Sequence, residues 1–265
     1  MGLWIIGNER RDTGLCPVLF QVGGLPIYSY GLMLAIAVAV GLFGALKLAR
    51  IEGCEEDLIY ELTIVMVVCG ILGARLFYVV FYAPDYFAAN PWAVLDLRTG
   101  GLVFYGGLLG GLLGGLGYIV KKRLSFWNLA DIFAPFLALG YSIARIGCFL
   151  NGCCYGKPTE LPWGVVFPSV DLVSRHPTQL YSSFLSLLLF TFLYWLFPRR
   201  SFSGQVFLTY LAGYGVVRFI IEFWRENLVV WHGFTIAQVT AVLVILMVIP
   251  IYLSRKKNKK YERVL

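Results

Sequence analysis

The sequence predicts an all-α, polytopic integral membrane protein with about seven transmembrane helices. Hydrophobic residues make up 59% of the 265 residues and charged residues only 14%, whereas ordinary globular chains hold roughly 45–50% and 25%. The mean hydropathy of +0.75 also excludes a disordered chain, which needs low hydrophobicity and high charge. The apolar residues gather into segments of about 20 residues, the length that crosses ~30 Å of hydrocarbon.

The predicted spans divide the chain into three parts. Residues 27–253 form the transmembrane domain, between an outer N-terminal segment, 1–26, and a basic tail, 254–265. The N-terminal segment carries four charges and lacks the apolar core of a signal peptide. We place the spans at about 27–49, 58–82, 104–120, 131–149, 179–197, 204–225 and 234–253.

The positions of lysine and arginine predict the orientation of these spans. Thirteen of the 22 cations follow the first, third, fifth or seventh span, and five lie in the N-terminal segment and the other connections. Positive residues favour the cytoplasmic side, so we expect the N-terminus outside and the C-terminus in the cytoplasm. The net charge of +7 is then a topological signal, and we expect no nucleic-acid partner. The thirteen are Lys47, Arg50, Lys121, Lys122, Arg123, Arg199, Arg200, Arg255, Lys256, Lys257, Lys259, Lys260 and Arg263.

Two further features predict architecture. Small residues recur four apart along the third span, a spacing that lets helices approach closely. The connection at about 83–103 is too polar to span, and we expect it to form an arm in the membrane interface. The small residues are Gly106, Gly107, Gly110, Gly111, Gly114 and Gly115.

Four arginines lie within spans or at their ends: Arg75, Arg145, Arg218 and Arg225. Near the bilayer centre an arginine costs about 2.5–3.5 kcal/mol on insertion scales. Arg218, Glu222 and Arg225 are spaced i, i+4 and i+7, which predicts one shared helix face. They form either a self-neutralising pair with a spare arginine or a cationic pocket for an anion. Arginine suits phosphate because its planar fork offers two parallel donors.

Residues 145–159 and 175–181 are the two densest motifs, at the two ends of a connection at about 150–178. Glycine, asparagine and proline interrupt the first just where the fourth span leaves the membrane. Irregular backbone at that depth must be buried in protein or line a cavity. The second motif contains His176, which at a helix start is more often a hydrogen-bond partner than a catalyst. His232 receives no role.

Three cysteines, Cys148, Cys153 and Cys154, lie in the first motif. With His176 they are candidates for a zinc site, but their C-x4-C-C spacing fits no standard ligand pattern. A disulfide from Cys148 to Cys153 or Cys154 is a second possibility on an oxidising outer face. Small apolar packing is the default interpretation. We therefore expect neither a metal nor a cofactor.

Six motifs from Tyr28 to Arg225 resemble, in order, those of the prolipoprotein diacylglyceryl transferases. One such motif alone is weak, but six in the right order are strong. The motifs are Tyr28-Ser29-Tyr30-Gly31-Leu32-Met33, Gly73-Ala74-Arg75-Leu76-Phe77-Tyr78, Phe104-Tyr105-Gly106-Gly107-Leu108, residues 145–156, His176-Pro177-Thr178-Gln179-Leu180-Tyr181, and Tyr214 to Arg225.

The resemblance implies a seven-span bacterial inner-membrane enzyme. Such an enzyme transfers the diacylglyceryl group of phosphatidylglycerol to the lipobox cysteine thiol of a prelipoprotein, forming a thioether and releasing glycerol phosphate. Its partners are then phosphatidylglycerol, prelipoprotein lipobox segments and the surrounding membrane lipids. Our hypothesis is that Arg145 and Arg218 hold the lipid phosphate and that Glu222 orients Arg218. The catalytic candidates are Tyr30, Tyr105, Arg145, His176, Arg218 and Glu222; the lipid-binding candidates are Arg75, Arg145, Asn151, Gly156, Tyr214 and Arg218.

This sequence departs from the family pattern at three positions. Tyr105 replaces a common histidine that is a candidate thiol base, Cys148 replaces an asparagine, and Cys153 replaces a glutamate. A phenol, with a reference pKa of about 10, is poorly matched to that task, and an imidazole such as His176 suits it better. We favour a subgroup with the same activity; the alternatives are a relative with another acceptor and an anionic-lipid transporter.

Overall fold

The computed structural model describes residues 15–23, 25–96, 100–168, 170–227, 229–231 and 233–258. Among these, the residues up to Gly41 and from Phe133 onward form one compact unit, and Leu42–Ile132 forms another. We call them the first and second unit and describe each by itself. The predicted segments 1–26 and 254–265 fall partly outside the described residues, as do Arg98 of the predicted arm and His232.

Every predicted span contains an α-helix, which confirms the all-α prediction. The helices are α1 (Ser29–Ile51), α2 (Glu56–Phe81), α4 (Phe104–Lys121), α5 (Phe126–Leu150), α6 (Thr178–Leu196), α7 (Gln205–Ile221) and α8 (Ile236–Asn258). Shorter helices are α3 (Pro84–Ala89) and the 3-10 turns η1 (Pro91–Leu95), η3 (Phe197–Arg199) and η4 (Glu222–Trp224).

Six of the described helices, α1, α2, α5, α6, α7 and α8, are long and apolar enough to cross a membrane. The chain is thus a multi-pass membrane protein. Helix α4 occupies the position of the third predicted span, but its glycines contribute little hydropathy. The count of seven spans and their orientation therefore remain predictions. Large side chains such as Phe43 and Leu72 are 70% and 63% exposed, as expected on helix faces that lipid covers.

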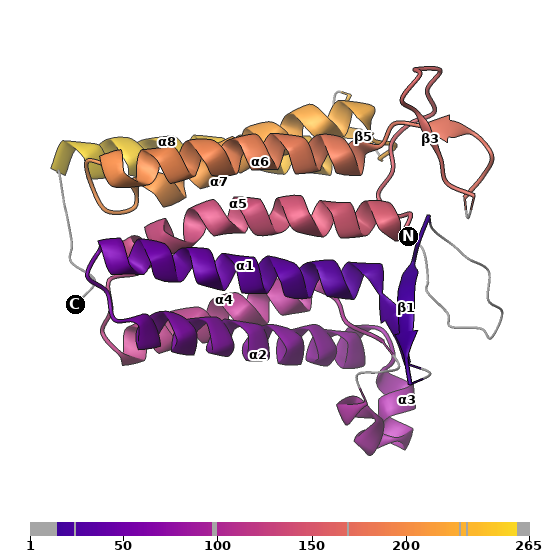
Figure 1. The fold of residues 1–265 in the computed structure, drawn as a ribbon, viewed down its shortest axis with the longest axis horizontal. Coiled ribbons are helices and arrows are strands. Elements are labelled where there is room, and N and C mark those ends of the chain that lie inside the picture. Colours follow the sequence, from indigo (N-terminus) through magenta and orange to yellow (C-terminus); the bar gives the residue numbers. More distant parts are fainter. Residues whose placement is uncertain are drawn as a thin grey trace. The chain divides into compact units, whose positions relative to one another are not determined.

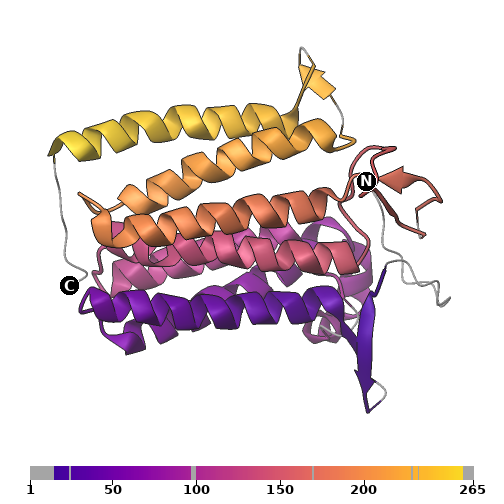
Figure 2. The same cartoon turned by 45° about the horizontal axis from the view of Figure 1, so that its top comes forward.

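Three small antiparallel hairpins lie in the first unit, one before α1 and two in the connections between helices. They pair β1 (Val18–Val22) with β2 (Leu25–Tyr28), β3 (Val165–Val166) with β4 (Ser174–Arg175), and β5 (Val229–Trp231) with β6 (Phe234–Thr235). They lie at the end of the unit where α1, α6 and α8 begin and α5 and α7 end (Figures 1 and 2). This end carries most of the polar motifs.

In the second unit, glycines bring the backbones of α2 and α4 into direct contact. A Cβ atom added to Gly110 would lie 3.0 Å from the Cα of Gly73, and one added to Gly73 would overlap the carbonyl oxygen of Gly106. Real Cβ atoms do not approach backbone atoms so closely, so only glycine fits here. This confirms that the glycine spacing of the third predicted span serves close helix packing.

The connection after α2 is tied down by Arg75, which is only 4% exposed. All five N–H donors of its guanidinium find backbone carbonyl oxygens. Nε donates to Val94 at 3.0 Å, Nη1 to Gly100 and Gly101 at 2.6 and 3.4 Å, and Nη2 to Ala93 and Asp96 at 2.7 and 2.9 Å. The guanidinium also lies 5.0 Å from the ring of Phe87 in α3. Arg75 therefore anchors the predicted arm to α2.

We expect Gly110→Ala to destabilise the second unit. The new methyl group forces α2 and α4 apart, and such overpacking costs about 1–3 kcal/mol. Denaturant unfolding in detergent micelles measures the loss. Gly117→Ala, on the same helix, is the matched control, because no atom lies within 4 Å of the added Cβ. Equal stability of the two variants would contradict direct backbone packing.

We expect Arg75→Lys to loosen the arm. An ammonium has three N–H donors where the guanidinium has five, so at least two carbonyls lose their partner. Hydrogen bonds to charged groups contribute about 1.5–3 kcal/mol each, so the free energy of unfolding should fall by about 3 kcal/mol or more. Faster proteolytic cleavage within α3 and η1 provides a local readout. Arg199→Lys, at an exposed arginine, is the control and should change neither quantity.

Candidate functional site

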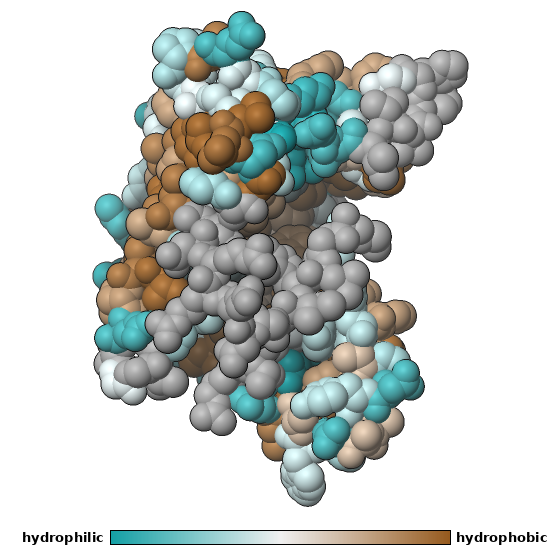
Figure 3. All heavy atoms as spheres, turned by 90° about the vertical axis from the view of Figure 1, so that its right-hand side faces the viewer, coloured by the Kyte–Doolittle hydropathy of each residue, from teal (hydrophilic) through white to brown (hydrophobic). Residues whose placement is uncertain are grey.

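Most of the predicted site residues lie at one end of the first unit. Tyr30 opens α1, Arg145 lies in the last turns of α5, and Arg218 lies near the end of α7. The loop from 151 to 177 and the β5–β6 hairpin adjoin them (Figure 1). Viewed from this end, hydrophilic and hydrophobic side chains form separate patches on the described surface (Figure 3). Leu172 and Trp163 of the loop are 85% and 56% exposed.

Arg218 and Glu222 form an ion pair one helical turn apart. Arg218 Nη2 lies 3.2 Å from Glu222 Oε2, and the Glu222 side chain is fully buried while that of Arg218 is 23% exposed. A carboxylate this deeply buried is costly unless it is paired. The pair leaves part of the guanidinium fork open to a ligand.

Asn227, which precedes β5, and Thr235, which ends β6, hold the second oxygen of Glu222. Oε1 accepts hydrogen bonds from Thr235 Oγ1 at 3.0 Å and from Asn227 Nδ2. Thr235 also caps α8: its Oγ1 accepts the Gln238 N–H at 3.3 Å, and its own N–H donates to Gln238 Oε1 at 3.0 Å. This reciprocal arrangement is a capping box. The start of α8 therefore fixes the carboxylate that positions Arg218.

The predicted shared helix face holds for Arg218 and Glu222, which form an i, i+4 ion pair, and is wrong for Arg225. Helix α7 ends at Ile221, Glu222 begins a 3-10 turn, and Arg225 is extended, with φ −96° and ψ 146°. The tighter turn breaks the 3.6-residue periodicity on which the prediction depended. Arg225 Nε is buried and has no hydrogen-bond partner among the described residues. It is a cationic donor available to an anion.

Arg145 has no acidic partner among the described residues. Its guanidinium lies 4.6 Å from the ring centroid of Tyr141, one turn earlier on α5, in a cation–π contact. Its Nη1 lies 4.0 Å from the sulfur of Cys148. A ring face stabilises the cation without consuming its N–H donors. Arg145 is therefore held in place with its donors largely free.

A pair of tyrosines joins Arg145 to Arg218. The rings of Tyr141 and Tyr214 meet edge to face with centroids 5.3 Å apart, and the electrostatic fields of both arginines act on Tyr214. Tyr30 of α1 lies against the end of α5. Close packing brings it there, since a Cβ on Gly147 would lie 3.2 Å from the Tyr30 Cα. The structure thus brings Tyr30, Arg145, Tyr214 and Arg218 together.

Gly156 fits closely into the loop, and the backbone of Asn151 continues the turn that ends α5. A Cβ on Gly156 would overlap the Trp224 carbonyl oxygen and lie 2.8 Å from the Cβ of His176. Its N–H donates to the His176 carbonyl at 2.9 Å. The Asn151 N–H donates to the Gly147 carbonyl at 3.0 Å, in the turn that ends α5. These contacts fix the loop around the arginines.

His176 is part of a hydrogen-bonded chain of rings. Trp163 Nε1 donates to the Tyr181 hydroxyl at 2.8 Å, and that hydroxyl lies 3.2 Å from His176 Nδ1. The direction of the bond between the Tyr181 hydroxyl and Nδ1 depends on the imidazole tautomer, since a hydroxyl donates one hydrogen bond and accepts two. No described interaction joins His176 to Arg145 or Arg218. His176 thus has a hydrogen-bond partner at this helix start, and its catalytic role stays a prediction.

Arg175 pins the same loop from its other side. Its Nη2 lies 2.6 Å from Asp171 Oδ2, and its Nη1 lies 3.1 Å from Glu226 Oε2. The adjacent guanidinium lowers the pKa of the Asp171 carboxyl below its usual range. The pair remains ionised at neutral pH and serves the structure of the loop.

Tyr105 and Arg75 lie in the second unit. Tyr105, the second residue of α4, is 68% exposed and makes an edge contact with the ring of Phe104. Arg75 uses all five donors on backbone carbonyls, which leaves none for a phosphate in this arrangement.

Sequence reasoning did not identify Tyr141 or Thr235 as contributors. Both lie in sequence patterns that could have identified them. Tyr141 precedes Arg145 by four residues, the spacing of a side-chain pair on one helix face. Thr235 and Gln238 match the capping-box pattern before an apolar run.

Comparisons with known proteins identify the family of this chain. A family model described as prolipoprotein diacylglyceryl transferase matches residues 17–254. Three curated relatives carry the name phosphatidylglycerol–prolipoprotein diacylglyceryl transferase. The relative from Bordetella avium is 42% identical over 219 residues, covering 79% of this chain and 81% of its own length. That from Clostridium tetani is 40% identical over 215 residues, with 80% and 86% covered. That from Finegoldia magna is 34% identical over 242 residues, with 91% and 96% covered. The chain belongs to the prolipoprotein diacylglyceryl transferase family.

Proposed function

We propose that this chain transfers the diacylglyceryl group of phosphatidylglycerol to the lipobox cysteine thiol of a prelipoprotein, the first step of bacterial lipoprotein maturation. Family membership supports the reaction. The observation that carries it is the group of arginines with unused donors at one end of the first unit, where Arg145 has a ring and a thiol for neighbours and Arg225 has a buried, unpartnered Nε.

The proposed role of the arginines follows from the charge that develops in the reaction. The thiolate sulfur bonds to the glyceryl carbon that carries the phosphate ester, and the bond from that carbon to the phosphate oxygen breaks. The departing glycerol phosphate gains a negative charge. Arg145 and Arg218 hold the phosphate and stabilise that charge as it forms. Glu222 is a positioning residue, because it contacts Arg218 and not the lipid.

The thiol must lose a proton, since a free cysteine has a pKa of about 8.5 and the thiolate is the nucleophile. Of the two ring candidates, Tyr105 is largely exposed, and Nδ1 of His176 already shares a hydrogen bond with the Tyr181 hydroxyl. Neither is in contact with the arginine group through a described interaction. The proposed function therefore needs another source of thiolate stabilisation.

We propose that the chain lies in the bacterial inner membrane with its N-terminus outside and its C-terminus in the cytoplasm. In the first unit, Arg199 and Arg200 follow α6, and Arg255, Lys256 and Lys257 end α8, at the end away from Arg145 and Arg218. The positive-inside rule then puts the proposed site on the outer side. A dry, membrane-embedded site limits competing hydrolysis.

The direct test supplies purified protein with phosphatidylglycerol vesicles and a lipobox peptide, and measures peptide mass and glycerol phosphate release. We expect a diacylglyceryl adduct on the cysteine peptide and none with its serine analogue or with phosphatidylethanolamine vesicles. An adduct on a different nucleophile supports a relative with another acceptor. Lipid movement across the vesicle without any adduct supports an anionic-lipid transporter. Either result contradicts the proposal.

We expect Arg145→Ala and Arg218→Ala each to lower kcat by about 100-fold or more, the usual effect of removing a preorganised donor to developing charge. Arg145→Lys keeps the charge but loses the planar fork, and its kcat should lie between those of the parent and Arg145→Ala. The control is Arg199→Ala, at the far end of α6, which should retain full activity. Near-normal turnover in a folded Arg145 or Arg218 variant would remove that residue from the phosphate site.

We expect Tyr105→Phe to keep its activity within about threefold of the parent and to leave the pH profile of kcat unchanged. The physical reason is the exposure of Tyr105 and a contact made by its ring rather than its hydroxyl. A base supplies about 100-fold or more, so a loss of that size with a shifted profile would assign the proton transfer to Tyr105.

A further inference from the structure

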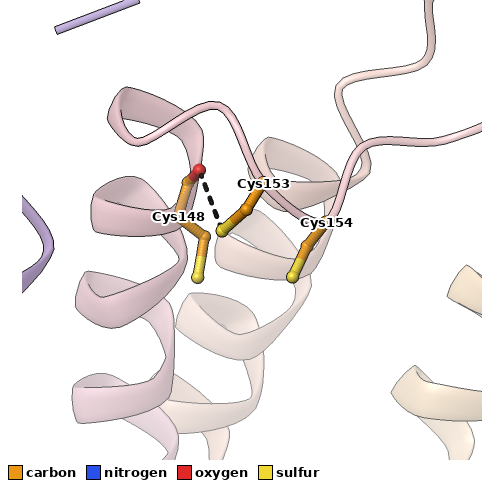
Figure 4. A group of neighbouring side chains, drawn as sticks. All are labelled: Cys148, Cys153 and Cys154. Atoms are coloured by element: carbon orange, nitrogen blue, oxygen red, sulfur yellow. Dashed lines mark hydrogen bonds between the residues drawn. The ribbon is translucent and has the colours of Figure 1, made fainter. Parts of the chain in front are cut away.

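Three thiols converge where α5 ends. The sulfur atoms of Cys148, Cys153 and Cys154 all lie within 4.8 Å of one another. Cys148 projects from the last turns of α5, and the other two project from the loop that folds back over it (Figure 4). Within the described ranges, no other three His, Cys, Asp or Glu side chains come this close. All three thiols are free.

The backbone is shaped to bring the thiols together. The Cys153 N–H donates to the Cys148 carbonyl at 3.1 Å, so the turn reverses within five residues. Gly152 and Cys154 have φ angles of 70° and 64°. The left-handed region suits glycine but is strained for cysteine, at a cost of order 1–3 kcal/mol, and such strain persists only where the surroundings enforce it.

Helix α6 supplies that enforcement. Gln179 Nε2 donates to the Cys153 carbonyl at 2.7 Å, and Thr178 Oγ1 donates to the Cys154 carbonyl at 2.9 Å. Both donors are 1% exposed. The side chains that open α6 therefore clamp the two loop cysteines, and the thiol cluster is preorganised before any ligand binds.

The spacing of the sulfurs fits a thiophilic metal ion better than a disulfide. Zinc–sulfur bonds of about 2.3 Å in tetrahedral geometry separate the sulfurs by about 3.8 Å, so a contraction of about 1 Å or less completes three bonds. A disulfide needs a sulfur–sulfur distance of about 2.05 Å. Three thiolates on a divalent ion leave one negative charge, and Nη1 of the cationic Arg145 lies 4.0 Å from the Cys148 sulfur.

We propose that Cys148, Cys153 and Cys154 bind one zinc ion and leave its fourth position open to the acceptor thiol of the lipobox cysteine. The metal site depends only on the thiol geometry, while its role in activating the acceptor rests on the proposed function. Catalytic zinc sites have three protein ligands and an open position, and Cys153 and Cys154 are only half-buried, so a substrate thiol can approach. This replaces the expectation of no metal, which rested on spacing along the sequence alone.

The chemistry balances without another reagent. On binding zinc, the acceptor thiol releases its proton to solvent, since a coordinated thiol is deprotonated. The resulting thiolate donates an electron pair to the glyceryl carbon, the carbon–sulfur bond forms, and the pair of the breaking carbon–oxygen bond leaves with glycerol phosphate. The neutral thioether is a weaker ligand and dissociates. Arg145, 4.0 Å from Cys148, places the leaving phosphate beside the nucleophile.

Metal content and cobalt spectroscopy test the site itself. Protein purified with zinc and dialysed should hold about one zinc per chain by elemental analysis, and cobalt replacement should give sulfur-to-cobalt charge-transfer absorption. Cys148→Ser, Cys153→Ser and Cys154→Ser should each lose most of the metal. Cys69→Ser, at a free, half-buried cysteine in α2, is the matched control and should keep it. Absence of metal from the parent protein, or an intact mass lower by two hydrogens from a disulfide, overturns the proposal.

The peptide tests the open position. Adding a lipobox peptide should change the cobalt absorption when it carries cysteine and leave it unchanged when it carries serine. Chelation should lower kcat by about 100-fold, the contribution expected of thiol deprotonation, and zinc should restore it. Full activity after chelation, or a cobalt spectrum indifferent to the cysteine peptide, overturns the activating role. If no adduct forms in any state while the metal stays bound to the three thiols, the proposed function fails and the metal site stands.

Discussion

The cost of keeping a guanidinium in a low-dielectric environment is the constraint on which this structure depends. The chain meets it in three different ways and leaves part of a fourth guanidinium without a described partner. Arg75 gives all five donors to carbonyls of the connection after α2. Arg218 pairs with the buried Glu222. Arg145 rests on the ring of Tyr141, and Arg225 keeps a buried Nε without a described partner. The four therefore divide into a saturated arginine, which organises backbone, and three with capacity left for an anion.

The position of Arg218 depends on a helix it does not belong to. Its partner Glu222 accepts a hydrogen bond from Thr235, thirteen residues further on, which also caps α8. A change at the start of α8 is thereby transmitted to the guanidinium through two hydrogen-bonded groups. The backbone of Glu222 is still helical and its N–H donates to the Arg218 carbonyl, so the end of α7 brings the carboxylate to Arg218 while Thr235 holds its second oxygen. The residues that cap α8 and the ion pair that positions Arg218 therefore belong to one hydrogen-bonded network.

The helices, the glycine contact of α2 with α4 and the unusual arginines follow from sequence, because hydropathy, spacing and charge cost are local properties. The groups that each guanidinium contacts do not follow from the sequence. The carbonyls that hold Arg75 come from residues 18 to 26 positions away, and only the folded connection brings them together. The i, i+4, i+7 rule failed at Arg225 because it presumes an uninterrupted helix. Asn151 and Gly156 were found by resemblance, and their packing in the loop became clear only from the folded chain.

For the three cysteines, spacing along the sequence argued against a cluster that the folded chain forms. Spacing rules for zinc describe ligands brought together by a simple turn, and C-x4-C-C does not satisfy them. Here a left-handed Cys154 and two clamps from α6 bring the sulfurs into one cluster. The departures from the family pattern then become chemically related. Tyr105 stands where an imidazole base is common, and Cys148 and Cys153 stand where an amide and a carboxylate are common. On the proposed zinc site, the chain would use a set of soft ligands in place of a proton acceptor to make the thiolate, because a metal ion lowers the cost of the charged sulfur just as a base removes its proton.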